Sequence, residues 1–316
     1  MQILWLVLRR LRDLIIVLVF VDTALFLILH SIPGSPAASL LGSNATDDQI
    51  AQLNATMGFD RPLFEQYVIW FGNLLQGDLG YSFSQGTQVG TAILAHLGPT
   101  LVLALTTTAI GILLAVPLAV LTVARPTSPI SRGLLGLATV ALSIPNFWLA
   151  LILILAFAVT FPIFPVSGYV SPFEDFGRAS WFLTLPVAVA VSHQVALLVL
   201  TLRESMSSEL LSHYVRTARA KGSNEGQVLY RHLLPNSLLP AVTVIANNFG
   251  TLLGGVIILE TIFLIPGIGW LLYGGILSRD YNLVLGVTLC TALLLVLINL
   301  LVDIVYGLLD PRVRVK

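Results

Sequence analysis

The sequence has little charge. Of its 316 residues only 10% are Asp, Glu, Lys or Arg, whereas a soluble domain normally carries about 25%. Hydrophobic residues make up 56%, and a water-soluble protein of this composition would expose large apolar patches. The composition therefore predicts a protein whose solvent is a lipid bilayer. Because the formal net charge is zero, nothing indicates nucleic acid as a partner.

Cysteine and the common catalytic motifs are also missing. Cys290 stands alone inside an apolar run, which excludes an internal disulfide and a multi-cysteine metal site. The sequence lacks the G-x-x-x-x-G-K-[ST] loop that binds nucleotide phosphates, and it lacks the ligand spacings of zinc sites. An intramembrane hydrolase is a weak alternative, because Ser192 and His193 are adjacent and would point to different helix faces. We expect no catalytic residues, no metal and no cofactor in this chain.

Long apolar runs are what the sequence does contain. About 20 helical residues cross about 30 Å of hydrocarbon, and six runs are that long. The predicted spans are residues 11–29, 100–124, 134–161, 181–202, 238–265 and 283–309. Pro117, Pro145 and Pro186 lie inside them and predict kinks, since proline removes a backbone hydrogen bond. The predicted fold class is an all-α polytopic membrane protein with six transmembrane helices.

Basic residues predict the orientation of these spans, because Lys and Arg accumulate in cytoplasmic loops. With the N-terminus inside, only three of the 16 Lys and Arg residues fall in outer segments, namely Arg61, Arg178 and Arg279. Both termini are therefore predicted to be cytoplasmic. A long outer loop covers residues 31–99, and a long inner loop covers residues 204–237.

The inner loop is predicted to form two helices around a glycine corner. Apolar residues recur at helical spacing between residues 209 and 220, and Gly222 suits the left-handed position after a helix. Asn224 with Gln227 can cap a second helix, which Pro235 would break. The first helix carries Arg216, Arg219 and Lys221. Such a basic, amphipathic helix could adhere to anionic lipid or dock into a groove on a soluble partner.

The order of residues in this loop resembles that of a known family. The segment YVRTARAKGSNEGQVLYRHLLPNSLLP at 214–240 is similar to the cytoplasmic loop of permease subunits of ATP-binding-cassette importers, where Glu-Ala-Ala, Gly and Leu-Pro recur at set distances. Ala218, Gly222, Leu234 and Pro235 hold the matching places. Arg216 and Thr217 replace the Glu and the first Ala, and His232 replaces an aliphatic residue. These departures are typical of the dipeptide and oligopeptide permease branch.

Other segments carry the same resemblance in order along the chain. They are PGSP at 33–36, MGFDRP at 57–62, GDLGYS at 77–82, FPVSGY at 164–169, ETIFLIPGIG at 260–269, RDY at 279–281 and NLLVDIVYGLLDPRVR at 299–314. Ser35 stands where the family usually has Asp. The motif residues expected near the outer face are Glu260, Pro266, Gly267, Gly269 and Asp280.

The resemblance implies a type I importer fold in the bacterial plasma membrane. Residues 1–96 would form the first span and the outer loop, 97–309 the transmembrane domain with its inner loop at 204–237, and 310–316 a cytoplasmic tail. The implied partners are a second homologous permease subunit, expected to be a different chain, and two ATPase subunits that bind ATP and Mg. An extracytoplasmic substrate-binding protein or lipoprotein would deliver short peptides, or else an oligosaccharide, glutathione or a nickel chelate.

The resemblance also implies roles for residues. The loop helix at about 209–221 would fit a cleft on an ATPase as a coupling helix, and ATPase closure would switch the spans from inward-open to outward-open. Gly222 would form the corner. Arg216, Arg219 and Lys221 would contact the ATPase, Tyr214 with Ala218 would form an apolar seat, and Thr217 lies between them. The polar residues expected to line the path are Asn146, Gln194, Asn247 and Asn248.

Intramembrane acids keep a rival hypothesis open, a proton-driven peptide transporter. Asp22, Glu260 and Asp303 are the candidate acids, with His193 as a relay partner. They fall on different spans, and two of them lie inside the family segments, where a packing role is favoured.

Overall fold

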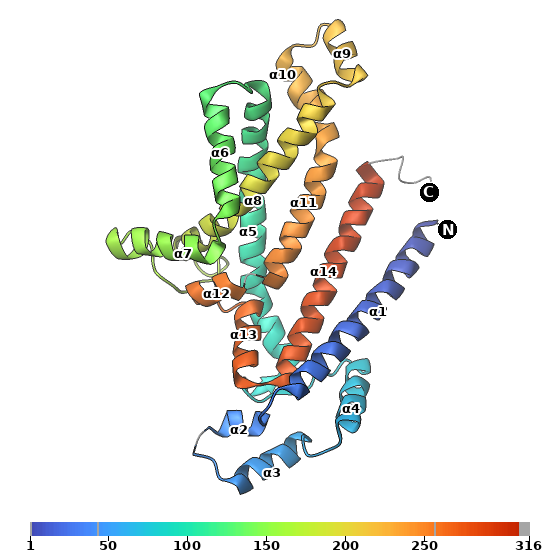
Figure 1. Cartoon of the computed structure of the whole chain (residues 1–316), viewed down its shortest axis with the longest axis vertical. Helices are drawn as coiled ribbons and strands as arrows, with labels where there is room; N and C mark the ends of the chain where they lie inside the picture. Colours follow the sequence, from blue (N-terminus) through green and yellow to red (C-terminus); the bar gives the residue numbers. More distant parts are fainter. Residues whose placement is uncertain (1, 43, 256, 310–316) are drawn as a thin grey trace. The chain divides into compact units, whose positions relative to one another are not determined.

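The computed structural model of this chain describes residues 2–42, 44–255 and 257–309, and it is mainly helical. Figure 1 shows the order of its helices along the chain. Its described residues divide into two compact units. The first unit comprises residues up to 100, 253–261 and 266–297. The second comprises 101–252, 262–265 and the described residues from 298 onward.

The first unit contains α1 and the folded outer loop. Its helices are α1 (Gln2–Ser31), α2 (Pro36–Leu41), α3 (Asp47–Met57), α4 (Leu63–Leu75), α13 (Ile268–Ser278), most of α14 (Tyr281–Leu309) and the start of α5 (Val89–Ala124). Thr46 and Gln49 cap α3 with a reciprocal pair of hydrogen bonds of 3.4 and 3.0 Å. A short antiparallel ribbon, β1 (Tyr81–Ser82) and β2 (Thr87–Gln88), departs from the predicted all-α fold.

The second unit contains the inner loop and the helices beside it. After the rest of α5 come α6 (Pro129–Ser143), α7 (Asn146–Ile154), the π-helix η1 (Leu155–Thr160), α8 (Phe176–Glu209), α9 (His213–Ala220), α10 (Glu225–Gln227), the π-helix η2 (Val228–Leu233) and α11 (Leu234–Gly255). The short α12 (Ile257–Phe263) is divided between the units. Small residues of α5, Ala115 and Ala119, pack against Leu198 and Leu202 of α8 and Ala241 of α11.

Three helical segments of the described chain are long and apolar enough to cross a membrane: Val89–Ala124, Phe176–Glu209 and Tyr281–Leu300. The number rises to five if each of two bent helix pairs counts as one span, and the apolar part of α1, Ile15–Ser31, is shorter. The protein is thus helical with three to five candidate spans, and the sixth stays a prediction.

The third predicted span, 134–161, is wrong as a single helix. α6 ends at Ser143, α7 begins at Asn146, and their axes differ by 103°. Ile144 has an extended backbone (ψ 125°), because the ring of Pro145 disfavours the helical conformation in the preceding residue. Pro117 and Pro186, by contrast, lie inside the continuous helices α5 and α8.

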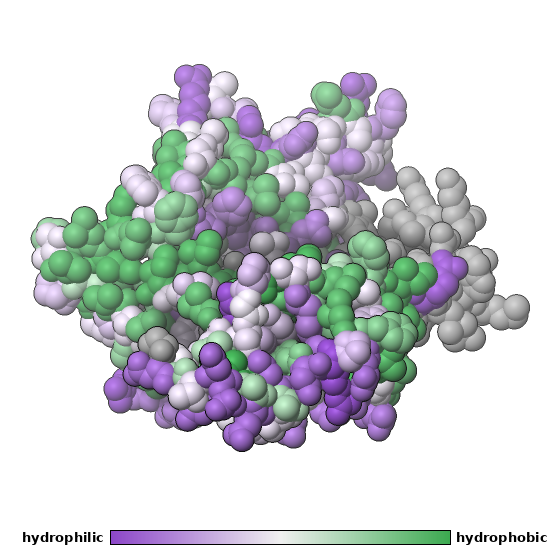
Figure 2. Space-filling view, turned by 60° about the horizontal axis from the view of Figure 1, so that its bottom comes forward, coloured by the Kyte–Doolittle hydropathy of each residue, from purple (hydrophilic) through white to green (hydrophobic). Residues whose placement is uncertain are grey.

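The α7–η1 segment that follows this bend is apolar on its exposed side. Figure 2 shows hydrophobic side chains covering it at the left of that view. Its exposed large residues are Phe147, Trp148, Leu151, Ile152, Leu155, Phe157 and Val159. The fifth predicted span likewise consists of two helices, α11 and α12, and Val256 between them lies outside the described residues.

Candidate functional site

The inner loop begins with a short turn after α8. α8 continues to Glu209, so the predicted start of the loop helix at that residue is wrong, and α9 begins only at His213. Ser212 has an extended backbone (φ −71°, ψ 152°), and its hydroxyl donates a hydrogen bond of 2.7 Å to the Glu209 carbonyl. This local bond separates the two helices, because Ser competes for backbone groups outside helices.

Gly222 ends α9 in the conformation predicted for it. Its φ is +87°, a left-handed value that a residue with a Cβ adopts at a cost of about 1–2 kcal/mol. Its N–H donates to the Arg219 carbonyl at 2.9 Å, and the Ser223 N–H donates to the Ala218 carbonyl at 3.1 Å. These two bonds form a Schellman motif, which satisfies the last carbonyls of the helix.

A reciprocal cap then starts the next helix. Asn224 Oδ1 accepts from the Gln227 N–H at 2.8 Å, and Gln227 Oε1 accepts from the Asn224 N–H at 3.2 Å. The predicted break at Pro235 is wrong: α10, η2 and α11 follow one another without a gap, and Pro235 stands in the first turn of α11. The helix tolerates this proline because it directly follows the π-helix η2, where the regular i to i−4 hydrogen bonds are already interrupted.

The apolar face of α9 is covered by the chain itself. Val215 is fully buried and Ala218 nearly so. Val215 belongs to a cluster with Val120 and Val123 of α5, Met206 of α8 and Val228, Leu229 and Leu233 of η2, with Tyr214 half-buried at its edge. Ala218 therefore faces its own subunit, and its expected place in an apolar seat for a partner stays a prediction. Val215, which lies three residues before Ala218 on the same stripe, was missed.

The exposed face of α9 is basic, but one of its charges is already paired. Arg219 forms two hydrogen bonds of 2.9 and 3.0 Å with the Glu225 carboxylate, and these raise the pKa of Arg219. Arg216 and Lys221 are exposed and form no ion pair with a described carboxylate. Thr217 is exposed beside them, and its hydroxyl bonds to the His213 carbonyl. The unpaired positive charge is thus at Arg216 and Lys221.

The motif at 260–269 folds around a buried glutamate in the first unit. Glu260 is 1% exposed, and its Oε1 accepts from the Thr100 hydroxyl at 2.6 Å. Its Oε2 accepts from the Trp270 N–H at 2.9 Å, while the Thr100 oxygen accepts from the Ile268 N–H at 2.8 Å. The carboxylate therefore binds the start of α13 to α5.

Two glycines of this motif are required by close contacts. A Cβ on Gly267 would collide with the Glu260 carboxylate, and one on Gly269 would lie 2.7 Å from the Ile257 Cα. Pro266, which precedes them, is half-buried. The glycines allow α12 and α13 to approach.

Asp280 joins three segments of the first unit. Its Oδ2 accepts from the Ser82 hydroxyl at 2.7 Å, the Ser84 N–H at 2.9 Å and the Ser84 hydroxyl at 2.8 Å. Its Oδ1 accepts from the Leu283 N–H at 3.2 Å, at the start of α14. The carboxylate is 2% exposed, so it is a buried anion whose donors come from the β-ribbon and α14.

The PGSP and RDY segments also meet. Arg279 donates a hydrogen bond of 2.6 Å to the Pro33 carbonyl, and a Cβ on Gly34 would collide with its guanidinium. Ser35 is the N-cap of α2, accepting from the Ala38 N–H at 3.4 Å, and its hydroxyl donates to Asn54 Oδ1. Asp could also cap this helix, so Ser35 keeps the capping function in place of the usual acid.

Comparison with known proteins decides the family. Residues 108–315 match the family described as "Binding-protein-dependent transport system inner membrane component", and residues 3–104 match the N-terminal family of the same systems. The chain belongs to this permease family. It is 35% identical over 312 residues to the oligopeptide transport system permease protein AppB of Bacillus subtilis, with 98% of each chain covered. It is 37% identical over 310 residues to the "Probable peptide ABC transporter permease protein y4tP" of Sinorhizobium fredii, again with 98% of each covered.

Family membership establishes the general character of this permease. It is a multi-pass inner-membrane component of a binding-protein-dependent, ATP-binding-cassette transport system for peptides. Such components are not enzymes, and the system includes ATPase and substrate-binding partners. The buried clusters around Glu260 and Asp280 therefore belong to a transport subunit.

The four polar residues predicted to line the transport path differ in their exposure. Asn146 begins α7 and is exposed, as is Asn247 on α11, whereas Asn248 is half-buried. Gln194 is 2% exposed, and its amide lies against Gly111 of α5, where a Cβ would be 2.9 Å from Gln194 Cδ. The path assignment stays a prediction for all four.

The structure describes some of the residues on which the proton-driven and hydrolase hypotheses depend. Asp22 is buried on α1, and neither carboxylate oxygen has a hydrogen-bond partner among the described residues. The side chain of Asp303 lies outside the described residues. Ser192 donates to the Val189 carbonyl of its own helix at 2.7 Å, so its hydroxyl is not directed at His193.

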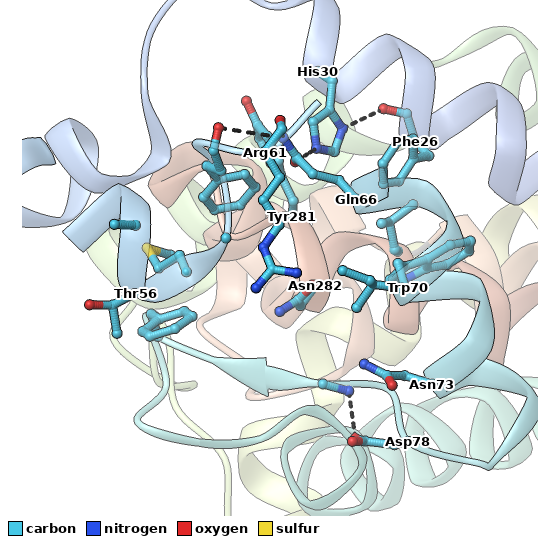
Figure 3. A pocket seen from close by; sticks show the side chains of 18 residues that line it. Phe26, His30, Thr56, Arg61, Gln66, Trp70, Asn73, Asp78, Tyr281 and Asn282 are labelled. Atoms are coloured by element: carbon cyan, nitrogen blue, oxygen red, sulfur yellow. Dashed lines mark hydrogen bonds between the residues drawn. The ribbon is translucent and has the colours of Figure 1, made fainter. Parts of the chain in front are cut away.

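A pocket of about 270 Å³ lies in the first unit (Figure 3). Aromatic residues of its wall are Phe26, Phe59, Trp70, Phe83 and Tyr281. His30 Nδ1 bonds to the Phe26 carbonyl at 2.8 Å, and its Nε2 lies 3.1 Å from Gln66 Oε1. Asp78 accepts from the Gly80 N–H at 2.8 Å. Because these polar groups bond to the chain itself, they favour a structural role for the pocket.

Replacing Val215 by alanine is expected to loosen α9. The change removes buried methyl groups and leaves a cavity, at a cost of about 1–2 kcal/mol. Amide hydrogen exchange in residues 213–220 should rise in the assembled complex. Thr217→Ala, on the exposed face, is the control and should leave exchange unchanged. Equal protection in both variants would show that the apolar cluster does not hold the helix.

Proposed function

We propose that this permease imports short peptides and that α9 is its coupling helix. Six spans with both termini in the cytoplasm would place α9 on the side where ATP is available. The observation that carries the proposal is the division of α9 into a buried apolar face and an exposed basic face. A helix built in this way can receive a force on one side and transmit it on the other.

The buried face supplies the connection to the spans. Val215 packs against Val120 and Val123 near the end of α5, against Met206 near the end of α8, and against η2, which continues into α11. Displacement of α9 therefore acts on three membrane helices of the unit at once. Closely packed interiors transmit such displacements with little compression. The proposed switch from inward-open to outward-open uses these contacts.

The exposed face supplies the contact to the ATPase. Arg216 and Lys221 are available for an acidic or polar groove, whereas Arg219 is held by Glu225 and stabilises the corner. ATP and Mg would be bound by the ATPase subunits. The second permease subunit would be a homologous but different chain. Names of relatives favour peptides, while an oligosaccharide, glutathione or a nickel chelate remain alternative cargoes.

Transport by the reconstituted complex is expected to depend on ATP and not on a proton gradient. The complex with its ATPases and binding protein would be placed in proteoliposomes with a mixture of isotope-labelled short peptides. Uptake should continue when a protonophore is added and should stop when ATP is omitted. Collapse of uptake by the protonophore at constant ATP would favour the proton-driven mechanism and would contradict the coupling role of α9.

A further inference from the structure

α4 differs in composition from the helix before it, although both lie in the predicted outer loop. α3 begins with Asp47 and Asp48. α4 has the sequence LFEQYVIWFGNLL, in which Glu65 is the only charged residue. That carboxylate lies in the first turn and pairs with Arg61 at 3.1 Å. The remaining residues of α4 carry no charged side chain that would favour exposure to water.

One face of α4 packs along the apolar part of α1. The Tyr67 hydroxyl and the Thr23 hydroxyl form a hydrogen bond of 2.8 Å. The Phe26 ring lies 5.2 Å from that of Tyr67 and 5.8 Å from that of Trp70, centroid to centroid. All of these residues belong to the first unit, so the position of α4 against α1 is defined.

The contacts with α1 set the depth of α4. Thr23 lies eight residues before Ser31, the end of α1, and a helix rises about 1.5 Å per residue. The contact with Tyr67 is therefore about 12 Å from the end of α1 along its axis, inside the apolar segment Ile15–Ser31. If α1 is the first span, as the sequence predicts, this level lies within the bilayer rather than above it.

A second face of α4 is apolar and uncovered. Phe64, Val68 and Leu75 are 78%, 51% and 75% exposed. Their spacing of four and seven residues places them on one stripe of the helix. At the same level α1 exposes Leu27 and Ile28. Both helices therefore expose large apolar side chains near the level of the Thr23–Tyr67 contact.

We infer that α4 lies in the outer leaflet, with Phe64, Val68 and Leu75 among the acyl chains. Trp and Tyr, both present on α4, are residue types enriched where proteins meet the membrane–water interface. The occupant of the stripe is therefore bilayer lipid. This assignment rests on membership of the membrane family and does not depend on the cargo or on the coupling role of α9.

Site-directed spin labelling tests this location. In a Cys290→Ser background, a single cysteine would replace Phe64, Val68 or Leu75, and the labelled permease would be assembled with its partners in lipid nanodiscs. Each label should collide more with oxygen, which concentrates in lipid, than with a water-soluble nickel chelate. Gln52→Cys, on the exposed polar surface of α3, is the matched control and should show the reverse order.

Thiol reactivity of the same variants gives a second measurement. A charged, membrane-impermeant maleimide should react with the Phe64→Cys, Val68→Cys and Leu75→Cys variants about tenfold or more slowly than with the Gln52→Cys variant, because hydrocarbon excludes the reagent and disfavours the thiolate. Reaction at equal rates would overturn the inference. The inference would also be overturned if the three cysteines reacted with the water-soluble maleimide and were protected from it only after the binding protein was added. That result would show a surface that docks a protein.

Discussion

Replacing Gly222 by valine is expected to abolish ATP-dependent uptake while the subunit stays in the membrane. The residue has a φ of +87°, and no atom lies within 4 Å of the place where a Cβ would stand. The effect is therefore conformational rather than steric, since a β-branched residue disfavours this backbone by about 1–2 kcal/mol or more. The chain would leave the Schellman motif, and the exposed face of α9 would turn away from its partner.

A graded series at this position separates backbone conformation from side-chain size. Asparagine tolerates the left-handed region better than alanine, and alanine better than valine, so uptake should fall in the order Asn, Ala, Val. Gly226→Ala, in the helical part of α10, is the control and should retain uptake. Uptake would be measured in proteoliposomes beside membrane content and co-purification of the ATPases. Full uptake by the valine variant would refute the coupling assignment of this corner.

The inner loop shows what sequence reasoning can reach. Gly222 and the Asn224–Gln227 pair obey rules that involve only a few neighbouring residues, and both predictions are confirmed. The start of α9 was wrong, because the bond from Ser212 to the Glu209 carbonyl competes with a helical pattern that continues through it. Val215 was missed because its importance comes from α5, α8 and η2, which are distant in sequence.

The membrane helices and outer motifs show the limits of the same reasoning. Apolar length predicted one continuous span at 134–161. Pro145 predicted a kink in it, which is confirmed, but the sequence did not indicate that the bend would reach 103° and divide the span into two helices. Gly267 and Gly269 were singled out by resemblance alone. Their reason is steric and involves Glu260 and Ile257, which belong to another helix. The burial of Gln194 against Gly111 likewise follows from packing that no local pattern records.

Replacing Asp280 by alanine is expected to destabilise the first unit more than any change to an exposed acid nearby. The substitution leaves the buried Ser82 hydroxyl, the Ser84 N–H and the Leu283 N–H without their acceptor. Loss of charge-assisted hydrogen bonds from buried donors costs about 2–4 kcal/mol. The thermal midpoint of the purified permease complex should fall accordingly.

Asp78 offers a matched control for Asp280, because it is exposed and accepts only the 2.8 Å bond from the Gly80 N–H in its turn. Asp78→Ala should shift the midpoint little, since an exposed group regains hydrogen bonds from water. Asp280→Asn should fall between wild type and Asp280→Ala, because its amide keeps one acceptor but loses the charge that three donors share at Oδ2. Equal midpoints for Asp78→Ala and Asp280→Ala would show that the β-ribbon and α14 are held together by their apolar contacts and not by this carboxylate.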